Sequence, residues 1–174
     1  MNKPIAVMFA GVPGSSKSPT AFYLSWQFGI PMFSNDSIRF AVKEDLLAND
    51  INNPRALKEY KRRSAVERKT ALAKKRSIIL DSSVDRHWLE IKQELDQYGY
   101  RHFLISFDMT YAFMVRLFQA TGRHGSIEEL GAYMHQHQAF LSRYGSEIQV
   151  SIQNKDFSNR FQITNQALGK FLRG

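Results

Sequence analysis

The feature that most limits the possible folds of this chain lies near its beginning. An apolar run, IAVMFA at residues 5–10, is followed directly by GVPGSSKS at residues 11–18. Short apolar runs bounded by turn residues form buried strands, and a Gly-rich turn ending in Lys-Ser is typical of a loop that leads from a strand into a helix and binds phosphate. We therefore predict a buried strand, a phosphate-binding loop and a helix over about 17–28.

The chemistry of such a loop depends on its backbone. Successive N–H groups must face an anion, and the start of the helix adds further N–H groups and the positive end of its dipole. Lys17 is expected to reach the β- and γ-phosphates of a nucleotide, and the Ser18 hydroxyl to bind Mg²⁺. The predicted nucleotide-binding residues are Gly11, Val12, Pro13, Gly14, Ser15, Ser16, Lys17 and Ser18.

One position departs from the pattern, which has glycine before the lysine where this chain has Ser16. Glycine adopts φ values that are unfavourable to other residues. Two alternatives follow: the loop keeps a helical φ at residue 16 and tolerates a small side chain, or nucleotide binding is weakened. Pro19 falls in the first helical turn, where a missing N–H costs the helix little. A Gly/Ser-rich turn with no ligand is the simpler interpretation of the same residues.

The rest of the chain alternates apolar runs with helical stretches, which indicates βαβ units and a parallel sheet. No linker or repeat divides the 174 residues, a length that suits one domain. We predict a single α/β domain over 1–174. Its expected strands are 5–10, 31–34, 77–81, 102–107 and 147–152, and its expected helices are 17–28, 36–48, 54–75, 86–98, 110–121, 127–143 and 158–172. Asn53-Pro54, Ser126 with Glu129, and Ser158 are the expected helix starts.

Composition excludes several classes of site. The chain has no cysteine, which rules out disulfides, thiolate metal sites and thiol catalysis. His135 and His137 are two residues apart on a predicted helix and point to different faces, so we predict no zinc site there. The first apolar run is too short for a signal peptide and no later run could span a membrane, so a soluble cytoplasmic protein is expected.

Acidic residues follow the second and third predicted strands. Asp36 and Arg39 share one face at a helix start, where the acid can accept the proton of an attacking hydroxyl and the arginine can grip a phosphate. Asp81 follows the third strand and can order Mg²⁺. Taken alone, Asp36 is better explained as a helix cap and Arg39 as a solvated ion-pair partner, whereas Asp81 is explained equally well as a cap. Together with the loop they predict a phosphoryl-transfer site at one edge of the sheet.

The formal net charge of +8 is concentrated in one segment. Residues 55–76 hold ten Lys or Arg against Glu59 and Glu67, so the remainder of the chain is neutral. Concentrated cations can track a nucleic-acid backbone, whereas a solvated helix with an apolar inner face is the alternative. A DNA or RNA end is therefore a possible partner of this segment.

Four segments, GVPGSSKS, SNDSIR, IILDSS and FDMTYAFMVRLFQATGR, resemble the P-loop kinases of the polynucleotide 5′-kinase group. Zeta-toxin-like and chloramphenicol phosphotransferase-like kinases are wider relatives. The resemblance implies a three-layer P-loop NTPase fold, a five-stranded parallel sheet with helices on both faces, and a helical lid over about 116–143. It also implies an adenine-binding loop at 153–157.

The resemblance further implies transfer of the γ-phosphate of ATP to a hydroxyl group, with Mg²⁺ as cofactor. The implied roles are a phosphate-binding lysine at Lys17, metal binding by Ser18 and Asp81, a general base at Asp36, an acceptor-phosphate contact at Arg39, and lid arginines at Arg116 and Arg123, with Arg143 as a further candidate. The favoured acceptor is a polynucleotide 5′-hydroxyl or a modified nucleotide. The alternatives are a small-molecule kinase acting on an antibiotic, nucleotide sugar or metabolite, and a catalytically weak nucleotide- or nucleic-acid-binding protein.

Overall fold

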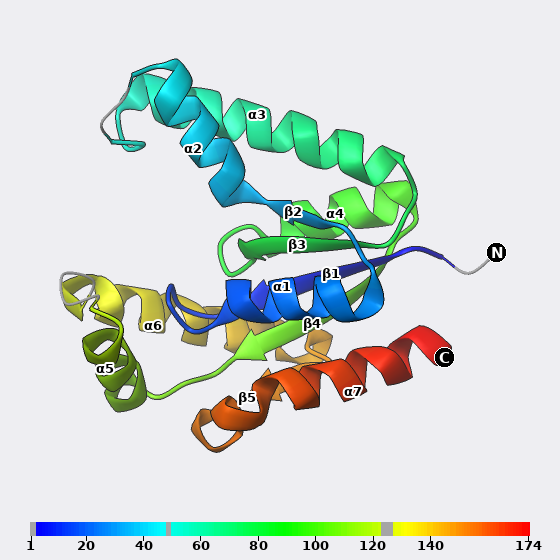
Figure 1. The fold of residues 1–174 in the computed structure, drawn as a ribbon, viewed down its shortest axis with the longest axis vertical. Coiled ribbons are helices and arrows are strands. Elements are labelled where there is room, and N and C mark those ends of the chain that lie inside the picture. The colour runs from blue at the N-terminus through cyan, green and yellow to red at the C-terminus, as the bar shows by residue number, and fades with distance from the viewer. Residues whose placement is uncertain (1–2, 48–49, 123–126) are drawn as a thin grey trace.

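The computed structural model describes residues 3–47, 50–122 and 127–174. Across these residues, five strands form one all-parallel sheet in the order β2-β3-β1-β4-β5 (Figure 1). The strands are β1 (Ile5–Ala10), β2 (Met32–Ser34), β3 (Ile78–Ser83), β4 (Arg101–Phe107) and β5 (Val150–Ile152). The predicted α/β class and the five strands are confirmed, although β5 begins three residues later than expected and β3 runs on past Asp81 to Ser83.

The helices also follow the predicted segments. They are α1 (Lys17–Phe28), α2 (Asn35–Asp45), α3 (Pro54–Ala73), α4 (Trp88–Tyr98), α5 (Tyr111–Ala120), α6 (Ile127–Tyr144) and α7 (Arg160–Arg173), with short 3₁₀ turns η2 (Gly145–Glu147) and η3 (Asn154–Asn159). Asn53 caps α3 as expected, because its side chain accepts from the N–H groups of Arg55 and Ala56. The predicted start at Ser158 is wrong, since η3 occupies that position and α7 begins at Arg160. The predicted cap at Ser126 lies outside the described residues.

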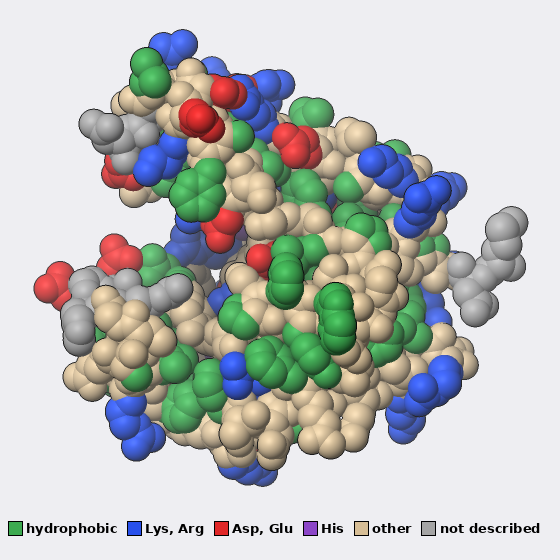
Figure 2. Space-filling model, in the orientation of Figure 1, with side chains coloured by type: hydrophobic (Ala, Val, Ile, Leu, Met, Phe, Trp, Pro, Cys, Tyr) green, Lys and Arg blue, Asp and Glu red, His purple; other side chains and the backbone are tan. Residues whose placement is uncertain are grey.

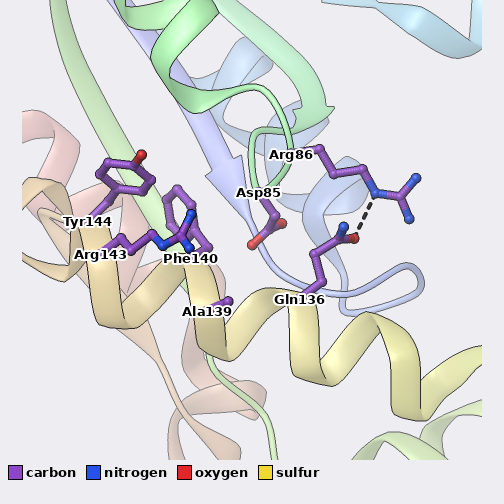
Figure 3. A pocket seen from close by; sticks show the side chains of 7 residues that line it. All are labelled: Asp85, Arg86, Gln136, Ala139, Phe140, Arg143 and Tyr144. Carbon is purple, nitrogen blue, oxygen red and sulfur yellow. Dashed lines mark hydrogen bonds between the residues drawn. The ribbon is translucent and has the colours of Figure 1, made fainter.

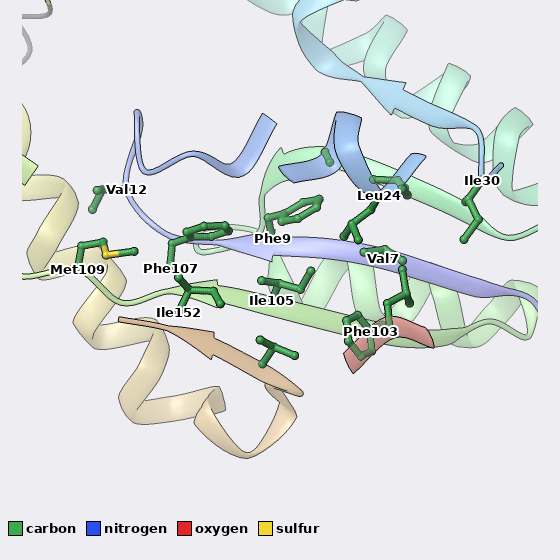
Figure 4. Packing of buried hydrophobic residues seen from close by; sticks show 14 of the residues in the cluster. Val7, Phe9, Val12, Leu24, Ile30, Phe103, Ile105, Phe107, Met109 and Ile152 are labelled. Atoms are coloured by element: carbon green, nitrogen blue, oxygen red, sulfur yellow. The ribbon is translucent and has the colours of Figure 1, made fainter. Parts of the chain in front are cut away.

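Burial explains why β1 is the central strand. All its residues are buried, and alternate side chains enter different hydrophobic clusters on the two faces of the sheet. Val7 and Phe9 pack with Leu24 of α1 and with neighbouring strands (Figure 4), whereas Met8 packs on the opposite face with Trp88 of α4. Helices α1 and α7 therefore cover one face, and α3, α4 and α6 cover the other, which makes a three-layer domain.

Helices α2 and α3 extend beyond this body. The two helices enclose a third, smaller cluster around Ile38, Val42 and Ala56. The opposite end of α3 enters the main core through Leu72, whose carbonyl accepts a hydrogen bond from the Tyr100 hydroxyl at 3.1 Å. Figure 2 shows a hollow between the α2–α3 pair and the part of the molecule formed by α5 and α6.

The parallel sheet places all strand C-termini on one edge, which faces this hollow. Residues 11–16 after β1, the start of α2 after β2, and residues 84–87 after β3 meet there. No helix within the described residues is long and apolar enough to span a membrane.

Candidate active site

The loop that follows β1 has the backbone of a phosphate cradle. Gly11 has φ 134° and Gly14 has φ 79°, and α1 begins at Lys17. Gly11 is required by space as well as by conformation, because a Cβ there would lie 3.0 Å from the Cβ of Phe107. The loop thus brings the start of α1 to the edge of the sheet, where an anion can bind.

Ser16 decides between the two alternatives that the sequence left open. Its φ is 78° and its ψ is 21°, which is the left-handed conformation. The alternative of a helical φ at residue 16 is therefore excluded, because the backbone keeps the geometry that glycine provides although a serine occupies it. Weakened nucleotide binding is the alternative that remains. The side chain of Ser16 is half-buried and accepts a hydrogen bond from Arg160.

Lys17 lies over the loop that precedes it. Its ammonium donates to the carbonyl oxygens of Gly11 at 2.7 Å and Val12 at 2.6 Å, and lies 3.4 Å from the hydroxyl of Ser15. The lysine charge is therefore held at the mouth of the cradle, where it is close enough to Asp81 to favour the ionised form of that carboxyl. This is the position in which a lysine can contact bound phosphates.

Ser18 and Asp81 meet across the space between α1 and β3. The side chains are hydrogen-bonded, and Asp81 lies inside β3, paired in register with Ser34 of β2. Burial raises the pKa of Asp81; the hydrogen bond from Ser18 opposes this effect and the nearby charge of Asp36 adds to it. A hydroxyl and one carboxylate suit Mg²⁺, which takes most of its remaining ligands from nucleotide phosphates and water.

The Ser18 hydroxyl oxygen and a carboxylate oxygen of Asp81 are the two ligands that the protein could provide to a magnesium ion. No group of three or more His, Asp or Glu side chains in the described ranges is arranged to hold a metal.

Asp36 and Arg39 lie at the start of α2, beside this pair. Their side chains form an ion pair of 3.4 Å, and both are about half exposed. The guanidinium of Arg39 also lies 5.7 Å from the ring centroid of Tyr60 on α3. The structure therefore brings Lys17, Ser18, Asp36 and Asp81 to one edge, with an arginine next to the most exposed carboxylate.

A buried acid–histidine pair behind the loop was missed by the sequence analysis. Asp85 accepts from the N–H of Gly11 at 2.9 Å, and its other oxygen lies 2.6 Å from Nδ1 of His137 on α6. Nε2 of His137 lies 3.4 Å from the hydroxyl of Ser106 on β4. The side chains of Asp85 and His137 are 7% and 1% exposed. The only available signal was a histidine on the inner face of α6, which the spacing to His135 alone could not pair with an acid.

Asp85 is ionised in this arrangement. Burial opposes its charge, but hydrogen bonds from His137, Ser83 and the N–H of Gly11 outweigh burial and hold the pKa of Asp85 below its usual range. The carboxylate therefore connects the first residue of the cradle to α6.

A cavity of about 400 Å³ opens beside this pair (Figure 3). Asp85 and Arg86 approach it from the loop after β3, and α6 lines it from Gln136 to Tyr144. Arg86 donates to Gln136 at 2.7 Å. Arg143, a candidate lid arginine, lines this cavity rather than the cradle.

The other predicted lid and adenine residues are only partly described. Arg116 is exposed on α5, with its guanidinium 5.9 Å from the Phe113 ring, and that ring packs 5.1 Å from Phe157 in the loop expected to bind adenine. Arg123 lies outside the described residues. The structure thus places Arg116 on the α5 side of the adenine-loop candidate and leaves its predicted contact with phosphate untested.

Three of the ten cations in the basic segment pair with carboxylates of the described residues, and these are Arg62, Arg63 and Arg68. Arg62 and Arg63 both bond Glu59, whose pKa is lowered to about 2 by those hydrogen bonds. Arg68 bonds Glu94 at 2.7 Å. These pairs reduce the charge that the segment offers to a nucleic acid.

The sequence matches none of the protein-family models and none of the curated proteins with which it was compared. Solved structures, in contrast, share its fold. A candidate kinase from Chloroflexus aurantiacus aligns over 98% of this chain and 98% of its own, with a TM-score of 0.64 and 13% identity. Shikimate kinase from Aquifex aeolicus aligns over 97% and 99%, with a TM-score of 0.59 and 15% identity.

A third solved structure contains ligands. The APS kinase of Mycobacterium tuberculosis, in complex with AMPPNP and APS, aligns over 97% of this chain and 99% of its own, with a TM-score of 0.56 and 13% identity. This chain has the P-loop kinase fold. Identity this low establishes the P-loop kinase fold alone, so the activity has to be argued from the site. The narrower resemblance to polynucleotide 5′-kinases and zeta-toxin-like kinases stays a prediction.

Proposed function

We propose that this protein is an ATP- and Mg²⁺-dependent kinase that transfers the γ-phosphate to a hydroxyl group of a small molecule. The observation that carries the proposal is the meeting of Lys17, Ser18, Asp36 and Asp81 at one edge of a P-loop kinase sheet. A general base and cationic groups around a phosphate cradle are what phosphoryl transfer to a hydroxyl requires.

Two observations support a small acceptor over a polynucleotide end. The similar structures include kinases named for shikimate and APS, which are small molecules. Arg62, Arg63 and Arg68 are paired with carboxylates of the same chain, which weakens the electrostatic argument for a nucleic acid. Arg39 beside Asp36 favours an acceptor with a carboxylate or phosphate group near its hydroxyl.

In the proposed reaction, the oxygen of the acceptor hydroxyl bonds to the γ-phosphorus of ATP while the bond between that phosphorus and the ADP oxygen breaks. Asp36 accepts the proton that the hydroxyl loses. Lys17 neutralises charge on the β- and γ-phosphates, while Arg39 orients the acceptor. Ser18 and Asp81 would hold Mg²⁺, which supplies charge neutralisation between the β- and γ-phosphates when it is bound.

The remaining parts of the proposal concern the lid residues, whose contacts with phosphate are predictions. We assign the lid to about 116–143, with Arg116 and Arg123 as its arginines, acting to stabilise charge on the transferring group and to exclude water. We take 1–174 as a single kinase domain and propose a cytoplasmic location for it.

The test is a transfer assay with γ-labelled ATP and Mg²⁺ against a panel of hydroxy acids, sugar acids, nucleotide sugars and 5′-hydroxyl DNA and RNA oligonucleotides. We expect label on a small acceptor. Asp36→Asn should lower kcat by at least about 100-fold and leave the Kd for ATP within about twofold, because the base acts on the acceptor.

Asp96→Asn is the matched control, since Asp96 is an exposed carboxylate near the C-terminus of α4. Label on an oligonucleotide end alone would replace the small acceptor with a polynucleotide. Binding of ATP with no transfer to any acceptor would favour a nucleotide-binding protein, and full turnover by Asp36→Asn would remove Asp36 as the base.

A further inference from the structure

The hydroxyl of Ser16 has an arginine partner from the far end of the chain. Arg160, the first residue of α7, donates from Nε to Oγ of Ser16 at 2.8 Å. A second nitrogen of the same guanidinium donates to the carbonyl of Phe157 at 2.6 Å. A guanidinium carries five N–H donors in a rigid fork, so these two contacts fix its plane while further donors stay on the group.

Aromatic rings hold the guanidinium in this position. Its central carbon lies 4.3 Å from the ring centroid of Phe157 and 4.2 Å from that of Phe161. Phe161 in turn packs on Tyr23 of α1, with ring centroids 5.0 Å apart. Arg160 is therefore a half-buried, oriented cation next to the cradle.

The charge of Arg160 lies in a region that is already positive. In the ranges 3–47, 50–122 and 127–174, no carboxylate lies within ion-pair distance of Arg160. Its neighbour Ser16 immediately precedes α1, whose N-terminus carries the positive end of the helix dipole, and Lys17 follows. Arg160 therefore carries a charge with no acid partner in these ranges, and a bound anion would stabilise that charge.

The start of α1 also lacks one of the donors that such an anion would use. The first N–H groups of a helix have no partner within the helix and are free to bind phosphate. Pro19 falls in this first turn and has no N–H. A further donor close to Ser16 would replace what the proline removes.

We propose that Arg160 is a second phosphate-binding cation of this site, which contacts the polyphosphate chain of the bound nucleotide, and that the Ser16 hydroxyl positions it. This inference rests on the proposed binding of a nucleoside triphosphate by the loop. It gives the serine that replaces the usual glycine a role: its Oγ holds the arginine beside the cradle.

The experiment measures Kd for ATP and for inorganic tripolyphosphate by calorimetry, with the full chain and Mg²⁺. Arg160→Gln should raise both Kd values about tenfold, which corresponds to about 1.4 kcal/mol. Arg160→Lys, which keeps the charge and loses the fork, should recover part of the loss. Arg173→Gln, an exposed arginine at the other end of α7, is the matched control and should leave both values unchanged.

Tripolyphosphate has no adenine, so it distinguishes a direct contact between Arg160 and phosphate from an indirect effect of Arg160 on adenine binding. Weaker ATP binding by Arg160→Gln with unchanged tripolyphosphate binding would overturn the proposal, because the arginine would then act through Phe157 and the adenine loop. Equal Kd values in Arg160→Gln and the wild type would overturn it as well. Circular dichroism checks that the variant is folded.

Ser16→Ala tests the positioning role. We expect a rise of about threefold in both Kd values, and no further rise when Ser16→Ala is added to Arg160→Gln, because the serine acts through the arginine. Additive effects of the two changes would overturn that coupling. If the wild-type protein binds neither ligand, the nucleotide site itself fails and this inference fails with it, a result distinct from a variant that binds like the wild type.

Discussion

At Gly11 the chain leaves β1 through a backbone conformation that side chains rarely adopt, and the space beside it is filled by Phe107 and Ser15. We expect Gly11→Ala to lower the free energy of unfolding by about 1–3 kcal/mol and to weaken ATP binding, because the loop has to move to admit a Cβ. Urea denaturation and calorimetry measure the two effects.

Gly131 provides the control for that change. It lies inside α6, with open space where a Cβ would be, and alanine is the better helix former. Gly131→Ala should therefore raise stability by about 0.5–1 kcal/mol. Equal stabilities of the two variants would show that Gly11 is not constrained.

Asp81 is a candidate Mg²⁺ ligand whose burial lowers the stability of the fold at neutral pH. Its pKa is raised in the folded state, mainly by burial, so the folded protein favours the protonated form and loses stability as the pH rises above the ordinary aspartate range, about 3.9. Asp81→Asn should stabilise the protein at pH 7 by less than about 1 kcal/mol, because the site is partly solvated. The gain should vanish below about pH 4, where the carboxyl is protonated in both states.

The same variant should lose the Mg²⁺ dependence of nucleotide binding. Thermal unfolding at pH 7 and pH 4, together with ATP titrations with and without Mg²⁺, measures both effects. A destabilised Asp81→Asn with intact Mg²⁺ dependence would assign Asp81 a purely structural role.

At this scale, the sequence predicts what is local. The cradle could be predicted because its residues are contiguous and each has a simple backbone requirement. The left-handed conformation of Ser16 could not, since its partner Arg160 is 144 residues away and no local pattern connects them.

At the scale of elements, the Asp85–His137 pair connects the loop after β3 to α6 and holds the N–H of Gly11 at the same time. We expect His137→Ala to lower the free energy of unfolding by about 3 kcal/mol at neutral pH, because it leaves a buried carboxylate without its partner. His135→Ala, two residues away on the exposed face of the same helix, should change it by no more than about 0.5 kcal/mol.

The pH dependence follows from the lowered pKa of Asp85. A depressed folded-state pKa stabilises the fold above the unfolded value, about 3.9, and this contribution is lost as the pH falls through the folded value. The difference in stability between wild type and His137→Ala should therefore shrink below about pH 4. Denaturation at a series of pH values measures it, and a difference that stays constant down to pH 2 would contradict the assignment.

Elements were predicted well where one local signal dominates. Asn53 marks the start of α3 because Asn-Pro combines a cap with a proline that suits the first turn. The start of α7 was missed because η3 satisfies the backbone after β5 by its own capping box, between Gln153 and Asp156, before the helix begins. The third strand was predicted to end at Asp81, whereas β3 continues to Ser83, since the polar Asp-Ser-Ser sequence hides the continued strand.

At the scale of the whole molecule, the excess charge lies over α3, where Figure 2 shows Lys and Arg side chains gathered along the helix. We expect salt-dependent binding of single-stranded oligonucleotides that is separate from catalysis. Changing Lys74, Lys75 and Arg76 to glutamine should lower the slope of log K against log salt by about 2, at about 0.7 per lost contact.

The matched variant changes Lys61, Arg62 and Arg63 to glutamine. It should have a smaller effect, because both arginines already pair with Glu59. Neither variant should alter transfer to a small acceptor. Equal loss of oligonucleotide binding in the two variants would contradict the screening role of Glu59, and loss of transfer would return the segment to the active site.

The fold class could be predicted for the whole chain because apolar periodicity and the cradle point to the same parallel sheet. The acceptor could not, because the residues proposed to handle it, Asp36 and Arg39, meet the phosphate cradle only through packing and not through any contiguous pattern. The charge count of 55–76 favoured a polynucleotide for the same reason: a count within the segment does not show that Asp45 and Glu94, from outside it, already face two of those cations.

The α2–α3 pair is attached to the domain at one end. One end of α3 packs in the main core, and its other end packs against α2 through a small separate cluster. Asp36 and Arg39 lie on α2 of this pair, whereas Lys17 and Ser18 lie on α1, which packs on the sheet. In the proposed mechanism, the part that handles the donor is therefore separate from the part that selects the acceptor. For protein engineering, we expect that exchanging residues 35–76 between chains of this fold would change the acceptor and leave the nucleotide-binding loop unchanged.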